Sequence, residues 1–523
     1  KNLQKLQLLR FLLRKRRKNK IKNTFDMENK HLFNRFLLKV DISGIQNFIF
    51  DIPSDNASKN LKGRSFYVYS LTHFAETFFK QHFSLPAPEI IFNGGGNLLM
   101  YLSANENELK TKIDEFQRDF LNSDIYPFIA YVKADDDNFE IQNSQLGTLL
   151  SIQKFKRNLN FTQYELSFNN IDWGELSKQL RKSQGFSIIT DNKNTIFSID
   201  KLSLTFSKEE KFAVSFENNL LNKIPINETG NVIGFDNIAK NALERGADEK
   251  LAALKMDVDN LGSLFIGMEK EKYKQMSQAV EIFFSTTIYT NVLQPYIDSG
   301  DIYPVFAGGD DTFIIGAWDK VFEVIPKIHS EFDKAQKEWR KNIIKKDDDI
   351  TISAGVIIVP PKYPMIRLAE ETENMLSLAK KEGKNRISIF GECITWEEFE
   401  KTSEMVIFLK DLILKKGESK ALLHRIKSSS IGFRSLQDRI RKRNEIDFPK
   451  VYRLKYFLRN VKPENKKELD KLFTKYSDAL IKDFLANKTN ADKSVLTNPA
   501  IFPIASRWTE LLIKNINQSV YNS

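Results

Sequence analysis

The sequence contains a single cysteine, Cys393, among its 523 residues. One thiol can form neither a disulfide framework nor a cysteine-ligated zinc site, so we expect a reducing compartment, the cytoplasm, and no zinc. No apolar run approaches the roughly 20 residues that cross a bilayer. Basic residues follow the short LQLLRFLL segment near the start, whereas they would precede the apolar stretch of a secretory signal. We therefore expect no membrane partner.

Charge is distributed unevenly along the chain. The formal net charge is +11, yet residues 1–25 carry ten Lys and Arg without an acid, and residues 401–523 carry 26 Lys and Arg against 13 acids. The middle of the chain is therefore acidic. Basic flanks favour a phosphate-rich partner and an acidic centre favours a cation site, although a Lys-rich stretch is equally often a solvated surface.

Two stretches of the sequence repeat one order of elements. Each begins with an apolar strand, continues through a helix, a glycine hairpin and a second helix, and ends on a strand. The expected elements are 36–44, 66–82, 89–103, 105–122 and 125–133 in the first copy, and 251–260, 268–297, 302–318, 319–341 and 350–359 in the second. This β-α-β-β-α-β order is ferredoxin-like, and its repetition supports each copy.

The sequence thus predicts an α+β protein with two ferredoxin-like palm domains, a small linking domain and a C-terminal helical bundle. Short strands and polar turns are expected for the linking domain, and a basic, flexible arm for the N-terminus. The predicted boundaries are 1–30 for the arm, 31–140 for the first palm, 141–235 for the linking domain, 236–395 for the second palm and 396–523 for the helices.

Three carboxylates of the second copy are predicted to meet. Asp257 ends an apolar strand, and Asp310 and Asp311 lie at the glycine hairpin of a neighbouring strand. Buried carboxylates are costly unless a cation compensates them, and two Mg²⁺ (or Mn²⁺) ions would do so while serving attack on a nucleotide phosphate. Asp259, expected on the same strand face as Asp257, is a secondary candidate.

Further residues of the second copy are candidates for nucleotide binding. The hairpin glycines permit a tight turn and close approach to a ligand, and the turn after Asp257 leads into a helix whose first amides can receive phosphate. Two lysines further along could neutralise a triphosphate. These candidates are Gly308, Gly309, Asn260, Leu261, Gly262, Lys380 and Lys384.

Several blocks together resemble one family, the large polymerase-like subunit of type III CRISPR effector complexes, on its Csm (III-A) branch. The blocks are DISGIQNFIF (41–50), GRSFYV (63–68), the GGGN hairpin, MDVDNLG (256–262), AGGDDTFIIGAWD (307–319) and SAGVIIVPPKYP (353–364). The resemblance covers residues 36–395 strongly and the helical tail weakly.

The resemblance implies two palm domains that face each other in an RNA-guided complex. On pairing of CRISPR RNA with target RNA, the second palm would join ATP into cyclic oligoadenylate. Other implied partners are a small helical subunit and the subunit that binds the RNA 5′ handle. The family's metal-binding carboxylates match Asp257, Asp310 and Asp311, and its phosphate-side lysines match Lys380 and Lys384 less closely.

The first palm has Asp41 but carries Gly96-Asn97 where the second has Asp310-Asp311. It is therefore expected to hold a nucleotide without catalysing a reaction. The candidate residues for that role are Ser43, Gly44, Gly94 and Gly95, for each of which a simple tight turn is the alternative.

The sequence departs from the family in two respects. Many members carry an N-terminal HD nuclease and a zinc site in the linking domain, but the five histidines here include no His-Asp pair and the one cysteine excludes that zinc site. The sequence therefore predicts no deoxyribonuclease activity in this chain.

Two alternatives to cyclic oligoadenylate synthesis stay open. The same site could make another nucleotidyl product, from GTP or as a free-standing diguanylate-cyclase-like enzyme. The chain could also be a mainly structural, RNA-binding subunit whose basic tail contacts RNA, with Arg441-Lys442-Arg443 as its densest patch.

Overall fold

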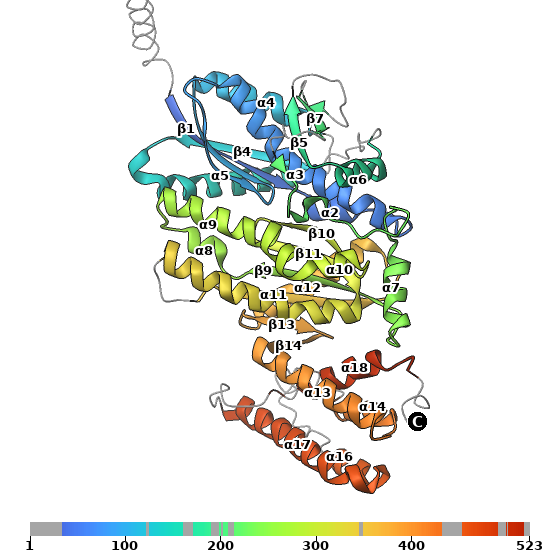
Figure 1. Cartoon of the computed structure of the whole chain (residues 1–523). Coiled ribbons are helices and arrows are strands. Elements are labelled where there is room, and N and C mark those ends of the chain that lie inside the picture. The colour runs from blue at the N-terminus through green and yellow to red at the C-terminus, as the bar shows by residue number, and fades with distance from the viewer. Residues whose placement is uncertain are drawn as a thin grey trace, which may run out of the picture. The chain divides into compact units, whose positions relative to one another are not determined.

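The computed structural model describes most of the chain: residues 34–121, 125–159, 171–189, 198–199, 202–207, 214–344, 349–430, 452–489, 498 and 500–516. The expected basic arm and the Arg441-Lys442-Arg443 patch lie outside these residues. The chain forms two compact units, residues 1–48, 64–215 and 262–281 in the first and 49–63, 216–261 and 282–523 in the second. Each unit is described by itself (Figure 1).

The first unit is built on a four-stranded antiparallel sheet with the order β2-β3-β1-β4. Its central strand alternates between faces, so that Leu38 and Val40 are fully buried while Lys39 and Asp41 lie on the other face. The predicted order is confirmed. The elements are β1 (Asn34–Ser43), α2 (Ile45–Phe50), α3 (Ala57–His82), β2 (Glu89–Gly94), β3 (Asn97–Ala104), α4 (Glu106–Arg118) and β4 (Tyr126–Lys133).

The region expected to contain only short strands and turns instead begins with a long helix, α5 (Phe139–Leu159). This helix packs on β4 and β1 and buries Leu146 and Leu150, so it continues the first repeat rather than starting a new region. The prediction failed because the apolar residues of α5 are interspersed with Ser, Gln, Asn and Thr. After it come α6 (Trp173–Lys182) and a small sheet, β6-β7-β5-β8, formed by β5 (Gly185–Ile189), β6 (Ser198–Ile199), β7 (Leu202–Ser207) and β8 (Val214–Ser215).

The second unit is built on a six-stranded sheet with the order β10-β11-β9-β12-β13-β14. Its central strand β9 is buried from Leu251 to Leu254 and pairs antiparallel with β11 and β12. The predicted second repeat is therefore confirmed. The elements are α7 (Phe235–Glu244), β9 (Leu251–Val258), β10 (Ile302–Gly308), β11 (Asp311–Ala317), α11 (Trp318–Trp339), β12 (Ile352–Val359), α12 (Met365–Lys381), β13 (Arg386–Ile389) and β14 (Glu392–Thr395).

The long helix expected from about 268 to 297 is confirmed, and two π-helical segments lie within it. It consists of α9 (Lys270–Ile282), two π-helical segments (Phe283–Thr287 and Tyr289–Leu293) and α10 (Gln294–Asp298). The π-helical segments begin with FFSTTIYT, which is rich in aromatic and β-branched side chains that crowd a regular helix. Pro295 lies in the first turn of α10, where proline is well tolerated.

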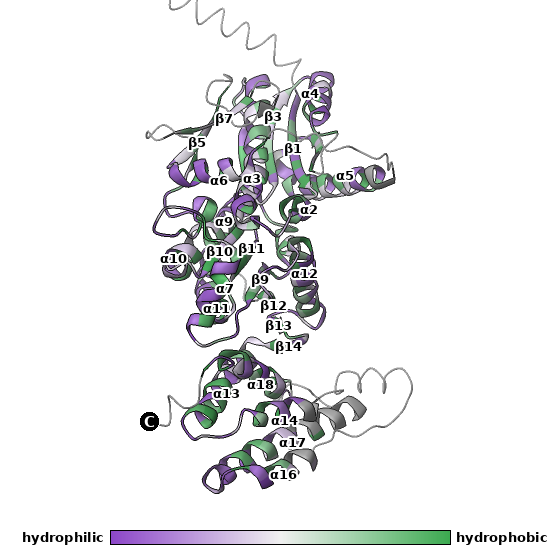
Figure 2. Ribbon diagram, turned by 90° about the vertical axis from the view of Figure 1, so that its right-hand side faces the viewer, coloured by the Kyte–Doolittle hydropathy of each residue, from purple (hydrophilic) through white to green (hydrophobic). Residues whose placement is uncertain are grey.

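Helices follow β14, as predicted. They are α13 (Trp396–Leu414), α14 (Ala421–Ser430), α16 (Tyr452–Phe457), α17 (Lys466–Thr489) and α18 (Ile501–Leu512), and α13 and α14 pack against α18. Green and purple residues both occur along α13 and α17, as expected of helices with one apolar face (Figure 2). Within the described residues, none of the helices has the length and apolar content to cross a membrane.

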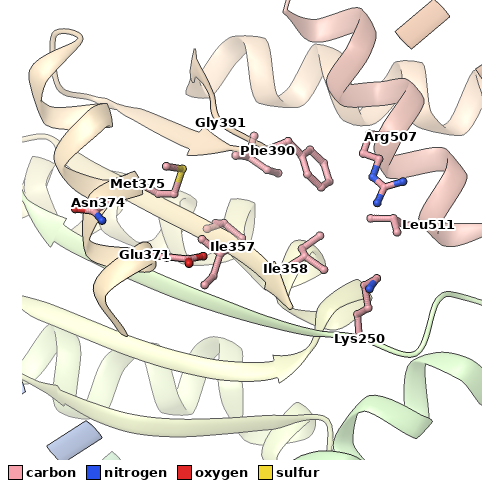
Figure 3. Close-up of a pocket in the computed structure, with 12 residues that line it drawn as sticks. Lys250, Ile357, Ile358, Glu371, Asn374, Met375, Phe390, Gly391, Arg507 and Leu511 are labelled. Atoms are coloured by element: carbon pink, nitrogen blue, oxygen red, sulfur yellow. The ribbon is translucent and has the colours of Figure 1, made fainter. Parts of the chain in front are cut away.

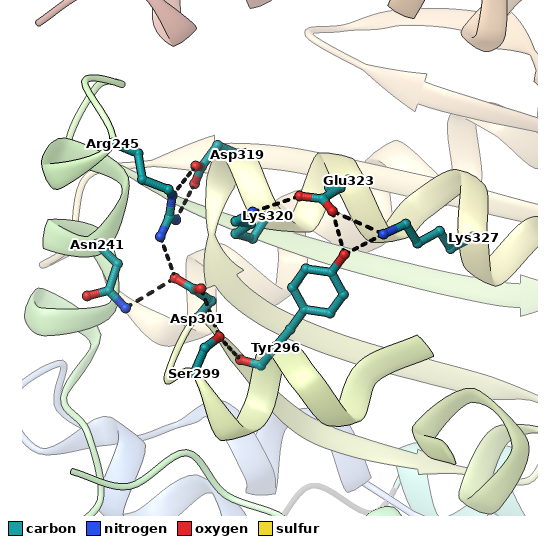
Figure 4. A network of polar contacts seen from close by, with 9 residues as sticks. All are labelled: Asn241, Arg245, Tyr296, Ser299, Asp301, Asp319, Lys320, Glu323 and Lys327. Atoms are coloured by element: carbon teal, nitrogen blue, oxygen red, sulfur yellow. Dashed lines mark hydrogen bonds and ion pairs between the residues drawn. The ribbon is translucent and has the colours of Figure 1, made fainter. Parts of the chain in front are cut away.

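A polar network joins α7, the residues just before β10 and the start of α11 (Figure 4). Arg245, which follows α7, donates to both oxygens of Asp319 at 2.6 and 2.8 Å and to Asp301 at 2.9 Å. Asp301 also accepts from Asn241 and Ser299. The network therefore joins the end of α7 to the start of β10 and of α11 within the second unit.

Candidate active site

The three predicted carboxylates meet at one end of the second unit's sheet. Asp257 on β9 is the direct register partner of Asp311, the first residue of β11. Directly opposed residues of an antiparallel pair have side chains about 5 Å apart, so these two carboxylates are neighbours. Asp310 lies in the turn just before Asp311, and its carbonyl accepts a hydrogen bond from the Val258 amide at 3.2 Å. The predicted convergence of Asp257 with the hairpin is therefore confirmed.

The hairpin turn explains the need for glycine. β10 ends at Gly308, which pairs with Asp311, so only Gly309 and Asp310 connect the two strands. Gly309 has a φ of +70°, in the left-handed region that glycine adopts without steric cost. This tight turn keeps Asp310 and Asp311 beside the end of β9.

Lysines neutralise two of these carboxylates. Lys380 Nζ on α12 donates to Asp257 Oδ1 at 2.5 Å, and Lys255 Nζ on β9 lies 3.3 Å from Asp311 Oδ2 and 2.7 Å from Glu373 Oε2. Even so, burial and the nearby Asp310 raise the pKa of Asp257 to about 6. Burial, with Asp310 and Asp257 adding to it, raises the pKa of Asp311 to about 7 against the opposing effect of Lys255. Burial is thus the main cause of both raised pKa values, and the three aspartates together with Glu373 share two lysines.

Lys255 and Glu373 were not predicted from the sequence. Lys255 lies two residues before Asp257 and thus on the same strand face, and Glu373 lies seven residues before Lys380 on the same side of α12. The sequence spacing places Lys255 on the strand face of Asp257 and Glu373 on the helix side of Lys380. Only the packing of α12 over β9 and β12 shows that these residues reach the site.

Gly355 on β12 lets α12 approach the sheet closely. It is the register partner of Lys255, and a Cβ built on it would lie 2.2 Å from the backbone nitrogen of Leu376 on α12. Only a residue without a side chain fits there. Close packing at Gly355 therefore brings Glu373 and Lys380 within reach of β9.

Asp259, the secondary candidate, has a structural role. It is 5% exposed and accepts hydrogen bonds from Thr351 Oγ1 at 2.8 Å, Ser353 Oγ at 2.8 Å and the Asn385 amide at 3.0 Å. These donors occupy both of its oxygens and join the end of β9 to β12 and to the loop after α12. Lys384, on that loop, donates to Asn260 Oδ1.

The expected phosphate-binding helix after Asp257 is short. α8 (Leu261–Phe265) has five residues, so its dipole is weak compared with that of a longer helix. A Cβ on Gly262 would meet no atom within 4 Å, so sterics do not require glycine there. The structure brings Asn260 near Lys384 and gives no separate support for Leu261 and Gly262.

The donor set suits a hard divalent cation. Carboxylate oxygens are the ligands that Mg²⁺ prefers. Burial, the largest cause of the raised pKa values of Asp257 and Asp311, disfavours their ionised forms, and a bound cation would favour those forms. No group of three or more His, Cys, Asp or Glu among the described residues has a closed metal-binding arrangement, because Lys380 and Lys255 engage the carboxylates. The residues fit a metal that would compete with these lysines.

The first unit repeats this frame with different side chains. Asp41 on β1 is the register partner of Asn97, the first residue of β3, as Asp257 is of Asp311. The Ile42 amide donates to Gly96 O at 2.9 Å, as the Val258 amide does to Asp310 O. The predicted match of Gly96-Asn97 to Asp310-Asp311 is therefore confirmed.

The other candidates of the first unit lie at the same end of its sheet. Ser43 and Gly44 follow Asp41, and the Phe48 amide donates to Gly44 O at the start of α2. Gly94 and Gly95 form the hairpin with Gly96, and Gly95 and Gly96 have φ values of +55° and +77°. Asn97 pairs with both Asp41 and Gly94, which places the two groups of candidates at the same end of the sheet, and the turn geometry accounts for the glycines at 95 and 96.

A cavity of about 450 Å³ in the second unit lies away from the carboxylates (Figure 3). Lys250, Glu371 and Arg507 contribute its charged groups, and Ile357 and Ile358 its apolar wall. Lys250 precedes β9, whereas Asp257 lies near its other end, roughly 20 Å along the strand. The carboxylate site therefore lies at the ends of the interior strands β9 and β11 and not in this cavity.

Two family models match the chain. The model of the Cas10/Cmr2 second palm domain matches residues 250–388, and that of Csm1 subunit domain B matches residues 34–182. The first range contains the three carboxylates, Lys255 and Lys380, and the second contains the first repeat with α5. Both repeats are thus covered by models of one group of proteins.

Known relatives agree with these matches. The Cas10/Csm1 single-strand-specific deoxyribonucleases (subtype III-A) of Methanocaldococcus jannaschii and Enterococcus italicus are 27% and 23% identical to the chain, over 71% and 75% of it. The chain spans about three fifths of the length of these relatives, 60% and 59%. Crystal structures of the Csm1-Csm4 cassette with pppApA and with cA4 align over 92% of the chain with TM-scores of 0.68 and 0.67 at 18% identity, covering 69% and 70% of the aligned Csm1 chains. At that identity, the structural likeness shows the fold.

Proposed function

Because the chain belongs to the Cas10/Csm1 family, the large subunits of type III-A CRISPR complexes, we propose that it joins ATP molecules into cyclic oligoadenylate at Asp257, Asp310 and Asp311. The observation that carries the proposal is the register pairing of Asp257 with Asp311 beside the Gly309-Asp310 turn. The neighbours solved with pppApA and cA4 support adenylate as the substrate class.

In the proposed reaction, the 3′-hydroxyl oxygen of one ATP bonds to the α-phosphorus of another. The bond between that phosphorus and the bridging oxygen breaks, pyrophosphate leaves, and the hydroxyl proton passes to solvent. Repetition and a final intramolecular attack close the ring. Mg²⁺ held by Asp257, Asp310 and Asp311 would lower the pKa of the hydroxyl and neutralise charge on the phosphates.

The chain's own residues would position the reactants. Lys380, released from Asp257, would pair with phosphate oxygens, and Lys384 would do so from the loop that also holds Asp259. Lys255, displaced from Asp311 by the metal, would stay paired with Glu373. Asp259, engaged by three donors, would fix the end of β9 and would not bind metal.

We further propose that the chain works in a complex with CRISPR RNA, target RNA, a small helical subunit and the subunit that binds the RNA 5′ handle. The cassette structures contain Csm1 with Csm4, which supports a neighbouring subunit of that kind. The expected lack of deoxyribonuclease activity stays a prediction, which incubation of the purified chain with single-stranded DNA and Mn²⁺ will test.

The decisive experiment uses the assembled complex with target RNA, ATP and Mg²⁺, and identifies the product by mass spectrometry. We expect cyclic oligoadenylate from the wild type and a loss of at least 100-fold in the Asp310→Ala/Asp311→Ala variant. Unchanged product in that variant would show that these carboxylates do not catalyse the reaction. A guanylate or mixed product would instead keep the site and change the substrate.

A further inference from the structure

Strand β12 continues past the end of its outer neighbour. β13 pairs with it only as far as Ile389, the register partner of Val356, whereas β12 runs on to Val359. On its other side, β12 stays paired with β9 along its whole length. Among the described residues, the last three of β12 therefore have one unpaired edge, and the cavity of about 450 Å³ lies along it (Figure 3).

The backbone of Ile358 faces this open edge. The Asp259 amide donates to Thr351 O, so Thr351 and every second residue after it bond to β9. Ile352 and every second residue after it, including Ile358, face the other way. The carbonyl of Ile352 confirms this, because it accepts from Trp396 Nε1 at 3.0 Å. In the part of the chain that the structure describes, no backbone group pairs with the N–H or C=O of Ile358.

The edge ends directly after Ile358. Pro360 and Pro361 come next in line, and proline has no N–H to donate. A strand that passed along the whole edge would find no further donor beyond Ile358. The open edge therefore suits the end of a chain better than the middle of one.

Two cations lie where an added chain would end. Lys250 is two residues before the register partner of Ile358, so the two residues share one face of the sheet. Arg507 is one helical turn before Leu511 on α18, and both line the cavity. Figure 3 shows both cations on one side of Ile358 and Glu371 on the other.

Both cations keep donors for a ligand. The Lys250 ammonium lies 3.8 Å from Asp248, a carboxylate that also pairs with a second lysine at 2.9 Å. Arg507 uses Nη1 on a neighbouring glutamate of α18, which leaves its other N–H groups free among the described residues. Glu371, the carboxylate of the cavity, accepts from a tyrosine hydroxyl. The cation side of the cavity therefore favours an anion.

Phe390 lines the same cavity in a strained conformation. Phe390 and Gly391 alone connect β13 to β14, and their φ values are +52° and +79°. A turn of this kind favours asparagine, aspartate or glycine at its first position, and a bulky side chain there is an outlier. Strained residues are concentrated at functional sites. The half-buried ring of Phe390 is therefore a candidate contact for an apolar group of a ligand.

We infer that this cavity binds the carboxyl terminus of an extended peptide from a protein partner, added to β12 in the line that β13 leaves. The peptide backbone pairs with the N–H and C=O of Ile358, and the terminal carboxylate binds Lys250 and Arg507. Alternate side chains of the peptide lie on the two faces of the sheet, one of them against Phe390. The inference is independent of the proposed nucleotidyl transfer.

The first experiment identifies a peptide that binds. The probe is a peptide array in which acetyl-Gly-Ser-Gly-Ser precedes every pair of C-terminal residues, and each peptide is made with a free carboxylate and with a terminal amide. We expect the full chain to select free-acid peptides with an apolar side chain in one of the last two positions. The strongest of these is then labelled with fluorescein at its N-terminus and titrated by fluorescence anisotropy.

Changes in the peptide test each contact without altering the protein. The amide form should bind about 10-fold more weakly, because it lacks the charge that Lys250 and Arg507 recognise. A peptide methylated on the nitrogens of its last two residues should also bind about 10-fold more weakly, because it cannot donate to Ile358 O. Neither result depends on the folding of a variant.

Variants of the chain provide the matching test. Lys250→Met should weaken the free-acid peptide about 10-fold and leave the amide form unchanged. Lys240→Met, at an exposed lysine of α7 outside the cavity, should change neither. Phe390→Asn suits the turn, so the melting temperature should hold while the peptide binds several-fold more weakly.

Three results would overturn the inference. They are an array in which no peptide binds the wild type, equal affinity for the free-acid and amide forms, and a loss in Lys250→Met that is the same for both forms. The Asp310→Ala/Asp311→Ala variant should bind the peptide as the wild type does, so failure of the proposed nucleotidyl transfer leaves this binding intact.

Discussion

Replacing Gly355 by alanine should disable the second-unit site without changing any residue proposed to bind nucleotide or metal. The added Cβ would lie 2.2 Å from Leu376 N, 2.7 Å from Met375 C and 2.8 Å from Leu376 Cα, all of them backbone atoms of α12. No side-chain rotation relieves these contacts. Ordinary contacts begin near 3.4 Å, so α12 has to move off the sheet by about 1 Å.

Movement of α12 carries Lys380 and Glu373 away from β9. A displacement of about 1 Å at a reacting centre lowers turnover roughly 100-fold, and overpacking of this kind costs about 1–3 kcal/mol of stability. We therefore expect Gly355→Ala to lose about two orders of magnitude in product formation and to melt several degrees lower. Product is measured by chromatography of the RNA-activated complex, and melting by circular dichroism of the full chain.

The matched control for this prediction is Gly234→Ala. Gly234 is the N-cap of α7, has a φ of −72° and has no atom within 4 Å of a built Cβ, so activity should stay within twofold of wild type. If Gly355→Ala kept wild-type turnover and melting temperature, the close packing of α12 would not be what positions Lys380. That result would refute the conclusion that the packing of α12 on the sheet positions the charged groups of the site.

Three other substitutions test other parts of the second unit. Lys255→Met removes an ammonium that competes with metal for Asp311, so the Mg²⁺ concentration that gives half-maximal product should fall. A Mg²⁺ titration measures this concentration, and an unchanged or higher value would contradict the competition. Arg245→Met leaves buried Asp301 without its cation and should lower the free energy of unfolding by about 2–3 kcal/mol in urea titrations, whereas a loss below 0.5 kcal/mol would show the network to be dispensable. Burial lowers the pKa of Lys62 to about 7, so the unfolded chain binds more protons than the folded chain between pH 7 and 10.5, and stability from this group rises with pH there. Lys62→Met should therefore reduce the increase in unfolding free energy between pH 7 and 9. A pH profile identical to that of the wild type would show that the pKa of Lys62 is not lowered.

Local sequence patterns were sufficient to predict much of the fold. The strands of both repeats are short apolar runs punctuated by glycine hairpins, and these patterns depend on neighbours within about ten residues. Asp257, Asp310 and Asp311 could be identified because each lies at the end of such a strand. The equivalence of Gly96-Asn97 with Asp310-Asp311 likewise followed from the matching position in two hairpins.

Most structural features that the sequence did not predict depend on contacts between distant segments. α5 is amphipathic only weakly, and its helical state is stabilised by β4 and β1, so the sequence between 139 and 159 predicted turns instead. Lys255 and Glu373 are separated by 118 residues and become partners only when α12 packs over the sheet. The two π-helical segments between α9 and α10 were not predicted either, because a periodic pattern does not distinguish π-helix from α-helix.

The difference between the two repeats lies in side chains rather than in backbone. Asp41 and Asp257 have equivalent register partners, and the hairpin carbonyls of residues 96 and 310 accept equivalent amides. A backbone frame shared to that degree cannot by itself make one site catalytic and the other not. The side chains can, because the second unit has Asp310 and Asp311 where the first has Gly96 and Asn97, and only paired carboxylates offer the oxygen ligands that a divalent cation prefers.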